Sequence, residues 1–352
     1  MLRSIFSKPY SKLYIVGDNS GWSVDEDAKD LKGFAEKLGI KAKIIKKARL
    51  NIPQAVHYTS QFSLQYNIYK NRHKLSVDYY HGNPEKQESF RKCFEALKEH
   101  HEKISRVRVS NREMEALIKS SGIDEGKVMR IPLGIDLNIF KSQTENSKPA
   151  LPAGGLKIRN SLGIPQDTVV IGSFQKDGVG WGEGNEPKLI KGPDIFLEVI
   201  SRLKSQIPNL WVLLSGPARG FVKNGLEKIG VPYRHKFLEN ADEISDLYDA
   251  LDLYLITSRE EGGPKACLQA MAKKVPLVTT EVGQCKDLVV NGKNAKMAAQ
   301  EDVDTLTEYA LEMLLDEKLR DFCTGNALVT AQENSFDSQL PKWREYMSVL
   351  VQ

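Results

Sequence analysis

The sequence contains little of what disulfide frameworks and membrane spans require. It has four cysteines among 352 residues, at positions 93, 267, 285 and 323, and no two of them form a Cys-x-x-Cys pair. That spacing predicts free thiols in a reducing compartment rather than disulfides or a zinc site. No segment approaches the roughly eighteen consecutive apolar residues of a membrane-spanning helix, and the first residues lack the long apolar stretch of a signal peptide. We therefore expect a cytoplasmic protein.

Several catalytic patterns are also missing. The sequence has no Gly-x-Ser-x-Gly, no GxxxxGK[ST], and no His, Cys and Asp residues clustered at the spacing of zinc ligands. These absences exclude a hydrolase built on a nucleophile elbow and a P-loop nucleotidase. No Asp-x-Asp directly follows an expected strand. We therefore predict chemistry without a metal ion held by the protein.

What is present is the composition of a soluble globular protein that is too long for one hydrophobic core. Hydrophobic residues make up 41% and charged residues 27% of the chain, which excludes a disordered chain or a coiled coil. Residues 1–150 carry 27 Lys and Arg against 18 Asp and Glu, or +9, and the remaining residues carry 23 against 28, or −5. This change of net charge between the two halves favours two domains with different partners, although a chance distribution of surface charge explains it equally well.

Short apolar runs alternate with amphipathic stretches along the chain, a pattern typical of parallel sheets covered by helices. The expected strands are residues 13–16, 41–45, 55–58, 75–80, 106–109, 128–131, 168–174, 210–215, 233–237, 253–257 and 276–279. The expected helices are residues 25–38, 85–103, 193–206, 221–229, 241–250, 265–273, 303–315 and 340–350. A segment rich in Ser, Pro, Lys and Gly, residues 141–155, is expected to link two Rossmann-like domains, residues 1–145 and 155–335.

The stretch from Ser258 to Ala272 is the most informative. It follows an expected strand and opens an expected helix, with Gly262, Gly263, Pro264 and Lys265 at the turn. A helix N-terminus presents backbone N–H groups and the positive end of the helix dipole, which suit a phosphate. Glu261 adds a carboxylate at the same strand end. A glycine-rich turn with a surface glutamate is the alternative.

This stretch resembles the motif of the retaining, nucleotide-sugar-dependent glycosyltransferases of the GT-B fold, the group 1 or family 4-like enzymes, in which two glutamates stand eight positions apart. The resemblance implies that Glu261 lies beside the donor sugar and that the second position, Gln269 here, binds the ribose hydroxyls. A glutamine can accept one hydrogen bond and donate another, but it brings no charge. Losing a charge-assisted bond weakens donor binding by roughly 1 kcal/mol.

A second match lies in two segments near residues 173 and 191. In the family an arginine after the first strand of the second domain and a lysine before the next helix pair with the donor diphosphate. Lys191 matches that lysine, whereas Ser173 stands where the arginine is common, and Lys176 is our candidate substitute. Two cations beside a diphosphate can neutralise developing charge as a divalent metal does. A pair of solvated lysines is the alternative.

Between these segments lies an insertion of alternating glycines, residues 177–187. It matches no phosphate-binding motif. We expect a flexible surface loop, with a ligand cradle or a lid over the donor as the alternative.

The remaining candidates follow other expected strands. The family often has a histidine at the position of His81, so the resemblance implies that His81 faces the reactive centre of the donor sugar. Gly17, after the first strand, and Ser215 with Gly216, after the strand 210–215, resemble glycine-rich segments beside the donor. Glycine lets a backbone approach a ligand closely. Plain turns are the alternative for Gly17, Ser215 and Gly216, and a purely structural histidine is the alternative for His81.

The resemblance implies an α/β protein with two Rossmann-like domains whose parallel sheets face a crevice, and a C-terminal helix, residues 336–352, that crosses back to the first domain. The implied co-substrate is a UDP-, GDP- or ADP-sugar, with Glu261, His81 and Lys191 as catalytic residues. The implied acceptor is a saccharide, a lipid-linked or another small molecule in glycan synthesis. The basic first half suggests contact with the anionic inner face of a membrane, and nucleic acid is not expected. A nucleotide-sugar epimerase and an inactive binding protein are the alternatives.

Overall fold

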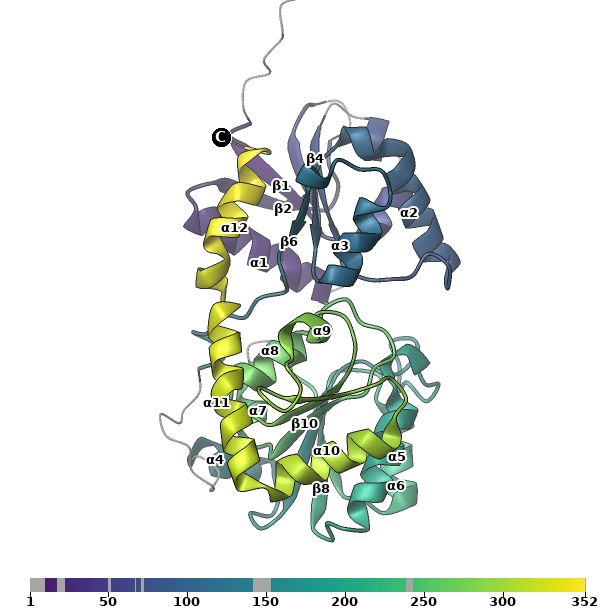
Figure 1. The fold of residues 1–352 in the computed structure, drawn as a ribbon, viewed down its shortest axis with the longest axis vertical. Coiled ribbons are helices and arrows are strands. Elements are labelled where there is room, and N and C mark those ends of the chain that lie inside the picture. Colours follow the sequence, from purple (N-terminus) through teal and green to yellow (C-terminus); the bar gives the residue numbers. More distant parts are fainter. Residues whose placement is uncertain are drawn as a thin grey trace, which may run out of the picture. The chain divides into compact units, whose positions relative to one another are not determined.

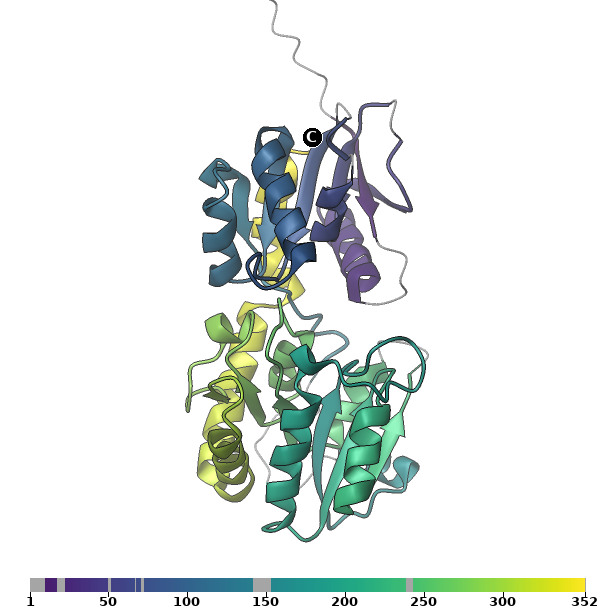
Figure 2. The ribbon, with the colours of Figure 1, turned by 90° about the vertical axis from the view of Figure 1, so that its right-hand side faces the viewer.

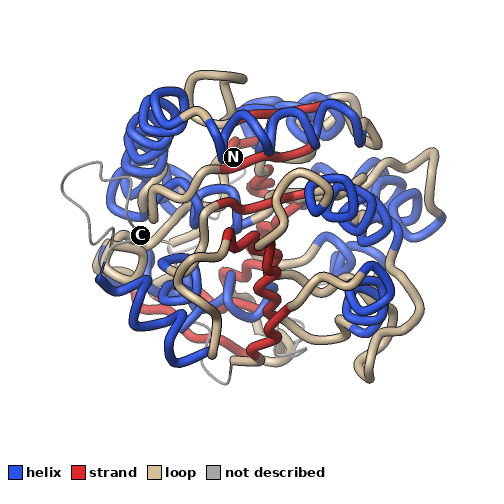
Figure 3. Tube along the Cα trace, turned by 90° about the horizontal axis from the view of Figure 1, so that it is seen from below, coloured by secondary structure: helices blue, strands red, loops and turns tan. Residues whose placement is uncertain are grey.

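The computed structural model describes residues 10–17, 23–49, 52–66, 68–70, 73–141, 153–238 and 243–351. The chain divides into two compact units (Figure 1). Unit 1 comprises Met1–Pro132 together with Phe336–Gln352, and unit 2 comprises Leu133–Ser335. Each unit is an α/β layer structure in which helices flank a parallel sheet (Figure 3). Among the described residues, no helix is both long enough and apolar enough to cross a membrane.

The described part of unit 1 contains one six-stranded parallel sheet in the order β2-β1-β3-β4-β5-β6. Its strands are β1 (Lys12–Val16), β2 (Lys41–Ile45), β3 (Ala55–Tyr58), β4 (Lys74–Tyr79), β5 (Ile104–Val109) and β6 (Val128–Arg130). Strands β3, β4 and β5 are mostly buried, as expected of inner strands that are covered on both faces, although they include polar side chains.

Helices cover both faces of this sheet (Figure 2). They are α1 (Ser23–Lys37) and α12 (Phe336–Ser348) on one face, and α2 (Glu88–His100) and α3 (Arg112–Lys119) on the other. Side chains alternate along a strand, so Leu13 and Ile15 of β1 join the core under α1 and α12, whereas Val16 joins the core under α2 and α3.

The C-terminal helix is an integral part of unit 1. Trp343 of α12 is completely buried, and its ring stacks on Phe34 of α1 with the centroids 4.9 Å apart. Tyr346 and Met347 are buried in the same core. The predicted return of the C-terminal helix to the first domain is therefore confirmed.

The described part of unit 2 also contains a six-stranded parallel sheet, in the order β12-β11-β10-β7-β8-β9. Its strands are β7 (Val169–Phe174), β8 (Leu210–Ser215), β9 (Tyr233–Lys236), β10 (Leu253–Ile256), β11 (Leu277–Thr280) and β12 (Lys296–Ala298). The first strand, β7, lies at the centre, with the next two on one side and the last three on the other. The strand order therefore reverses between β7 and β10.

Two helical layers enclose this sheet. One layer contains α5 (Pro193–Lys204), α6 (Gly220–Ile229) and α10 (Val303–Leu315). The other contains α4 (Ala153–Leu162), α7 (Ile244–Asp249), α8 (Lys265–Ala272) and α11 (Glu317–Glu333), and the short helix α9 (Cys285–Leu288) packs beside them. The four cysteines, all within the described ranges, are buried free thiols.

The chain passes from unit 1 to unit 2 between Pro132 and Leu133, ahead of the 141–155 segment in which we expected the boundary. Ile135 and Phe140 are buried in the core of unit 2, and Ile135 forms a parallel bridge with Ser335, so this stretch packs with the second unit. The expected linker is helical from Ala153 onwards, and its residues 142–152 lie outside the described residues.

Candidate functional site

The predicted residues of unit 2 gather at the carboxyl ends of β7 and β10. These strands are neighbours in the sheet, with Leu253 opposite Ile171 and Tyr254 opposite Gly172. Because the strand order reverses between them, the chain leaves the two strands toward opposite faces of the sheet, and open α/β sheets bind ligands at such a point. The loop after β7 carries Lys176, Lys188 and Lys191, and the loop after β10 carries Glu261.

Lys191 and Glu261 form an ion pair. Lys191 Nζ lies 2.6 Å from Glu261 Oε1, and the two side chains are 22% and 14% exposed. The Ser258 hydroxyl also donates to Glu261 Oε1, at 3.1 Å. The structure therefore brings together the residues that we predicted for the diphosphate and for the sugar. An anionic ligand at Lys191 would compete with this carboxylate.

Gly192 holds Lys191 against the end of β10. Its backbone is left-handed, with φ of 61°, and a Cβ there would overlap the Thr257 carbonyl oxygen. The Thr257 hydroxyl donates to the Gly192 carbonyl oxygen at 2.8 Å, and Gln175 Nε2 donates to the Lys191 carbonyl oxygen at 3.1 Å. Only glycine allows this close approach, which explains the Lys-Gly pair before α5.

Arg259 ties the same two loops together. Its guanidinium binds both carboxylate oxygens of Asp194, at 2.8 and 2.7 Å, and donates to the Leu189 carbonyl oxygen at 2.7 Å. Hydrogen bonding from Arg259 lowers the pKa of Asp194. The backbone N–H groups of Arg259 and Glu260 both donate to the Ile190 carbonyl oxygen. This bidentate pairing fixes the backbone on which Lys191 stands.

Lys188 is a third cation at this site, and our sequence reasoning missed it. Burial lowers the pKa of Lys188, and the positive charges of Lys191 and Lys176 lower it further, whereas Glu261 opposes the shift. The charges of Lys191, Lys176 and Glu261 therefore all act on Lys188. The available signal was the Pro-Lys-Leu-Ile-Lys-Gly run, in which we considered only the second lysine. Such an excess of positive charge suits an anion that carries more than one charge.

The insertion, which we expected to be a flexible surface loop, is a hairpin at the surface, with residues 179–183 exposed. Gly178 and Pro187 form an antiparallel bridge, and the Val179 N–H donates to the Glu186 carbonyl oxygen at 2.9 Å. We call residues 177–187 the 177–187 hairpin. Beside it, the ammonium of Lys176 lies 3.6 Å from the ring centroid of Trp181, a cation–π contact.

The 177–187 hairpin docks on the N-terminus of α6. The N–H groups of Gly220 and Phe221 donate to the carbonyl oxygens of Glu183 and Gly184, at 2.6 and 2.9 Å. A Cβ on Gly184 would overlap the backbone of Ala218, so the two segments are in close contact. The hairpin therefore satisfies N–H groups that a helix start leaves unpaired.

A buried Arg219–Asp177 pair lies beneath the hairpin. The Arg219 guanidinium donates to the carbonyl oxygens of Ser173, Gln175 and Ser215, at 2.6, 3.0 and 2.8 Å, and lies 3.0 Å from Asp177. Both side chains are 0% exposed in that pair. Burial raises the pKa of Asp177 and lowers that of Arg219. Ser173 thus has an arginine beside it, although one that belongs to the segment before α6 and is buried.

Ser215 and Gly216 lie at the end of β8. The Ser215 carbonyl oxygen accepts from Arg219, and the Gly216 carbonyl oxygen lies 2.7 Å from His235 Nε2. A Cβ on Gly216 would lie 2.8 Å from the Gln175 carbonyl oxygen. Gly216 is therefore in close contact with the β7 loop, whereas Ser215 pairs with Phe174 at the end of β7, and their predicted role beside the donor stays a prediction.

The Gly262–Lys265 turn leads into α8. Gly263 is packed so closely that a Cβ would lie 2.9 Å from Gln284 Oε1, and the Gln284 N–H donates to the Gly262 carbonyl oxygen at 3.1 Å. Pro264 precedes the first helical residue, Lys265. Further along α8, Gln269 Oε1 accepts a hydrogen bond from the Tyr248 hydroxyl at 3.0 Å.

Two predicted residues, Gly17 and His81, belong to unit 1. Gly17 follows β1, and the rest of its expected loop, residues 18–21, lies outside the described residues. His81 follows β4 by two residues, and its ring packs edge-on against Phe90 with the centroids 5.2 Å apart. Gln61 Nε2 donates to the His81 carbonyl oxygen. A Cβ on Gly82 would overlap the Phe90 ring, so the glycine after His81 is required.

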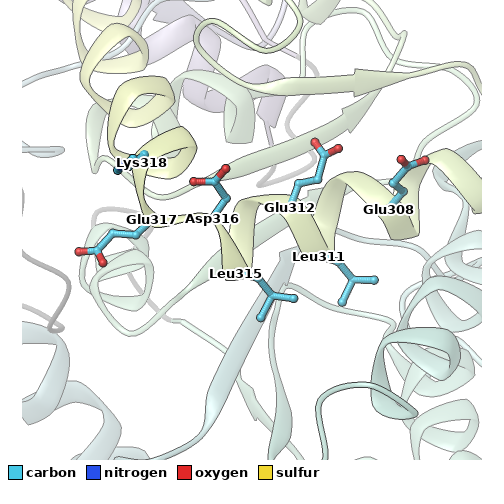
Figure 4. Close-up of a pocket in the computed structure, with 7 residues that line it drawn as sticks. All are labelled: Glu308, Leu311, Glu312, Leu315, Asp316, Glu317 and Lys318. Atoms are coloured by element: carbon cyan, nitrogen blue, oxygen red, sulfur yellow. The ribbon is translucent and has the colours of Figure 1, made fainter.

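Two further observations bear on ligands. Within the described ranges, no group of three or more His, Cys, Asp or Glu side chains is placed to hold a metal ion. A groove at the junction of α10 and α11 contains none of the predicted residues (Figure 4). Its lining residues are Glu308, Leu311, Glu312, Leu315, Asp316, Glu317 and Lys318.

The fold is shared with solved structures over nearly the whole chain. HepE from Anabaena, solved with UDP and glucose, aligns with a TM-score of 0.74 at 16% identity, over 96% of this chain and 99% of HepE. Sucrose-phosphate synthase from Thermosynechococcus elongatus aligns with a TM-score of 0.74 at 15% identity, over 97% and 99%. At these identities the likeness concerns the fold alone. The predicted class, an α/β protein of the GT-B fold, is confirmed.

Curated relatives match part of the chain. The lipopolysaccharide core biosynthesis mannosyltransferase of Rhizobium meliloti is 25% identical over 232 residues, which are 63% of this chain and 62% of the relative. A D-inositol 3-phosphate glycosyltransferase of Xylanimonas cellulosilytica is 24% identical over 238 residues, 66% of this chain and 53% of the relative. The chain thus spans less than two thirds of the length of these relatives. Residues 187–328 match the family model described as glycosyl transferases group 1, which confirms the resemblance drawn from the motifs.

Proposed function

We propose that the protein is a retaining glycosyltransferase that moves a sugar from a nucleotide diphosphate donor to an acceptor hydroxyl. The observation that carries the proposal is the ion pair of Lys191 with Glu261 at the point where the strand order reverses, beside Lys188, whose pKa is affected by Lys191, Glu261 and Lys176. The relatives named as glycosyltransferases support it. UDP is the first donor nucleotide to test because HepE was solved with UDP and glucose, and GDP and ADP follow.

In the proposed reaction the acceptor oxygen forms a bond to the anomeric carbon, and the bond from that carbon to the diphosphate oxygen breaks. The bonding electrons leave with the diphosphate, and the acceptor proton is transferred to the departing diphosphate oxygen. The three lysines, with the backbone of residues 262–265, stabilise the developing negative charge. Once the diphosphate has bound Lys191, Glu261 binds the sugar. His81 is proposed to face the reactive centre of the donor sugar.

The ion pair between Lys191 and Glu261 predicts how the site changes when the donor binds. The diphosphate takes Lys191, and this frees a Glu261 oxygen to accept hydrogen bonds from sugar hydroxyls. Ser258 keeps the carboxylate in place through its hydroxyl. Charges held in place in this way interact with a ligand more strongly in a site that excludes water than they do on the surface.

The test uses the full chain, the UDP-, GDP- and ADP-forms of common sugars, and saccharide acceptors. We expect one donor to raise the melting temperature by mass action and to release nucleoside diphosphate when an acceptor is present. Lys191→Met should lower kcat/KM by roughly 100-fold or more. Lys228→Met is the matched control, because Lys228 is an exposed lysine on α6, outside the site. If no donor shifts the melting temperature and none turns over, the proposal is rejected.

A nucleotide-sugar-binding protein without transferase activity is the second candidate, and Ser173 and Gln269 are the departures that favour it. This candidate predicts a thermal shift with a donor but no product with any acceptor. An epimerase would instead convert the free nucleotide sugar in the absence of acceptor. Product analysis by mass spectrometry and chromatography separates the three outcomes.

We further propose a cytoplasmic location with peripheral contact to an anionic membrane. In unit 1, Lys29 and Lys32 of α1 and Lys43 of the edge strand β2 line one groove together with Ile44 and Glu36. Lys32 is paired with Glu36, and Lys29 is paired with Glu26. Clustered lysines beside an exposed apolar side chain suit anionic headgroups. Sedimentation with vesicles rich in phosphatidylserine should retain the protein at low salt and release it at high salt. Binding that salt does not change, or no binding, rejects this proposal.

A further inference from the structure

The 177–187 hairpin places an aromatic ring against one cation of the candidate site. Trp181 lies in the exposed part of the hairpin, with 60% of its surface exposed. The ammonium of Lys176 lies over its indole ring, 3.6 Å from the centroid. A cation over the face of a tryptophan is attracted by the negative charge of the ring face. The contact therefore restrains the ammonium end of a side chain that is otherwise long and flexible.

The backbone of Lys176 is fixed independently of the ring. Arg219 donates to the carbonyl oxygen of the preceding residue, Gln175, at 3.0 Å. The same guanidinium lies 3.0 Å from the carboxylate of the following residue, Asp177. The Asp177 carbonyl oxygen also accepts from the Lys188 N–H at 2.7 Å. Lys176 is therefore held at both ends, at its backbone through its two neighbours and at its ammonium through the indole ring.

The segment that carries Trp181 is itself anchored by side chains. The carboxylate of Glu183 lies 3.3 Å from the ammonium of Lys223 on α6. Asn224, also on α6, donates from Nδ2 to Asn185 Oδ1 at 3.1 Å. These contacts add to the backbone hydrogen bonds that dock the hairpin on α6. The indole ring is therefore presented from a segment that is tied to the body of unit 2.

The ammonium of Lys176 is accessible to an anionic ligand. Within the described ranges, Lys176 pairs with no carboxylate, whereas Lys191 is paired with Glu261. An ammonium has three N–H donors, so contact with the ring on one side leaves donors for a ligand on the other. Burial and the charge of Lys191 lower the pKa of Lys188, and the charge of Lys176 lowers it as well. Lys176 therefore lies close enough to the other two lysines to act on the same anion.

We propose that Trp181 is a positioning residue that holds the ammonium of Lys176 in place for the diphosphate of the donor. The inference rests on the proposed function, which supplies the diphosphate. A lysine side chain loses much rotamer entropy when it binds a ligand. Because Trp181 restrains the ammonium beforehand, part of that loss has already occurred in the unliganded protein, and binding is stronger. Lys176 can bind the diphosphate at once, whereas Lys191 must first leave Glu261.

The test measures binding of UDP, GDP and ADP to the full chain by calorimetry, and then of the tightest of the three to variants. Trp181→Leu should bind it about 3-fold more weakly than the wild type does, because the cation–π contact is lost. Trp181→Tyr keeps an aromatic face and should bind within about 2-fold of the wild type. Phe322→Leu is the matched control, because it removes an aromatic residue of α11 that is 56% exposed and lies outside the site. This control should bind as the wild type does.

The action of Trp181 through Lys176 has its own readout. Lys176→Met should weaken binding of the diphosphate about 10-fold, because a charge-assisted contact is lost. In this background, Trp181→Leu should have no further effect. A tryptophan that contacts the ligand directly, or that only stabilises the hairpin, would instead weaken binding equally in both backgrounds.

The outcomes separate the two proposals. If the wild type binds none of the three nucleotides, the proposed function fails and this inference fails with it. If the wild type binds a nucleotide and Trp181→Leu binds it equally well or more tightly, only this inference is overturned. Tighter binding would mean that the indole ring competes with the ligand for the ammonium. An equal loss with and without Lys176, or a Trp181→Tyr that binds as weakly as Trp181→Leu, also overturns the positioning role.

Discussion

Replacing Arg219 by methionine should destabilise unit 2 strongly. Methionine retains much of the volume but removes the guanidinium that pairs with Asp177 and binds three carbonyl oxygens. Breaking a buried ion pair from one side costs about 3–5 kcal/mol, because the other charge stays buried without a partner. For a unit of this size each kcal/mol lowers the melting temperature by roughly 2–4 °C. We therefore expect a fall of about 6–20 °C in the transition of unit 2.

Differential scanning calorimetry at pH 7 is the suitable assay, because a chain with two units need not unfold in one step. The double variant Arg219→Met with Asp177→Asn is the matched control, since it also removes the stranded carboxylate, and it should regain about 2 kcal/mol.

The pH dependence of this effect has a defined sign. Burial raises the pKa of Asp177 above its ordinary value of 3.8, so the folded chain holds this proton more tightly than the unfolded chain does. The contribution of Asp177 to stability therefore falls as pH rises through the window from the ordinary to the raised pKa. The charge of Arg219 lowers the pKa of Asp177, so in Arg219→Met this pKa rises and the window extends to higher pH. A melting temperature of Arg219→Met within about 2 °C of the wild type at pH 7 would refute the reasoning.

Three further substitutions test other parts of the molecule. Gly192→Ala should cost at least about 1–2 kcal/mol, because φ is positive there and the Cβ meets Thr257; unchanged stability and unchanged nucleotide affinity in calorimetry would contradict the close approach. Trp343→Ala should cost about 3–5 kcal/mol in the transition of unit 1, and an effect on unit 2 alone would be inconsistent with our assignment of α12. Burial opposes ionisation of Asp78, but nearby positive charge outweighs it and lowers the pKa of Asp78, so this carboxylate stabilises unit 1 above its ordinary pKa and the contribution is lost as pH falls through the lowered value. Asp78→Asn should therefore reduce the loss of unfolding free energy that urea titrations detect as pH falls. An unchanged loss at acid pH would contradict this role of Asp78.

The sequence predicted the parts of the site that depend on local pattern. Glu261 and Lys191 follow apolar strands and precede helices, and the order of strands and helices is enough to bring such strand ends to one edge of a sheet. The bounds of β2, β3, β8 and α10 were likewise predictable, because each is an apolar or amphipathic run between clear breaks.

Contacts between distant segments were not predictable in this way. Arg219 is one charged residue in a turn, and nothing local indicates that it is buried against Asp177, 42 positions earlier. We expected the 177–187 hairpin to be flexible because its glycines have no side chains, yet Gly178 and Gly184 allow close packing on Ala218, ahead of α6.

The helix α11 was missed for a related reason. Its buried side chains are Cys323, Thr324, Ala327 and Ala331, which are too small to produce an apolar stripe in the sequence. Small side chains are instead what allows α11 to pack closely beside α8 in the same core.

The return of α12 to unit 1 has a consequence for how the chain folds during synthesis. Unit 2 is continuous from Leu133 to Ser335, so all of it can leave the ribosome before α12 has been made. Unit 1 begins first but lacks Trp343 and Tyr346, two of its completely buried side chains, until the last stretch emerges. N-terminal domains usually fold first. Here the core of unit 2 can be completed first, while unit 1 still exposes the apolar face that α12 covers.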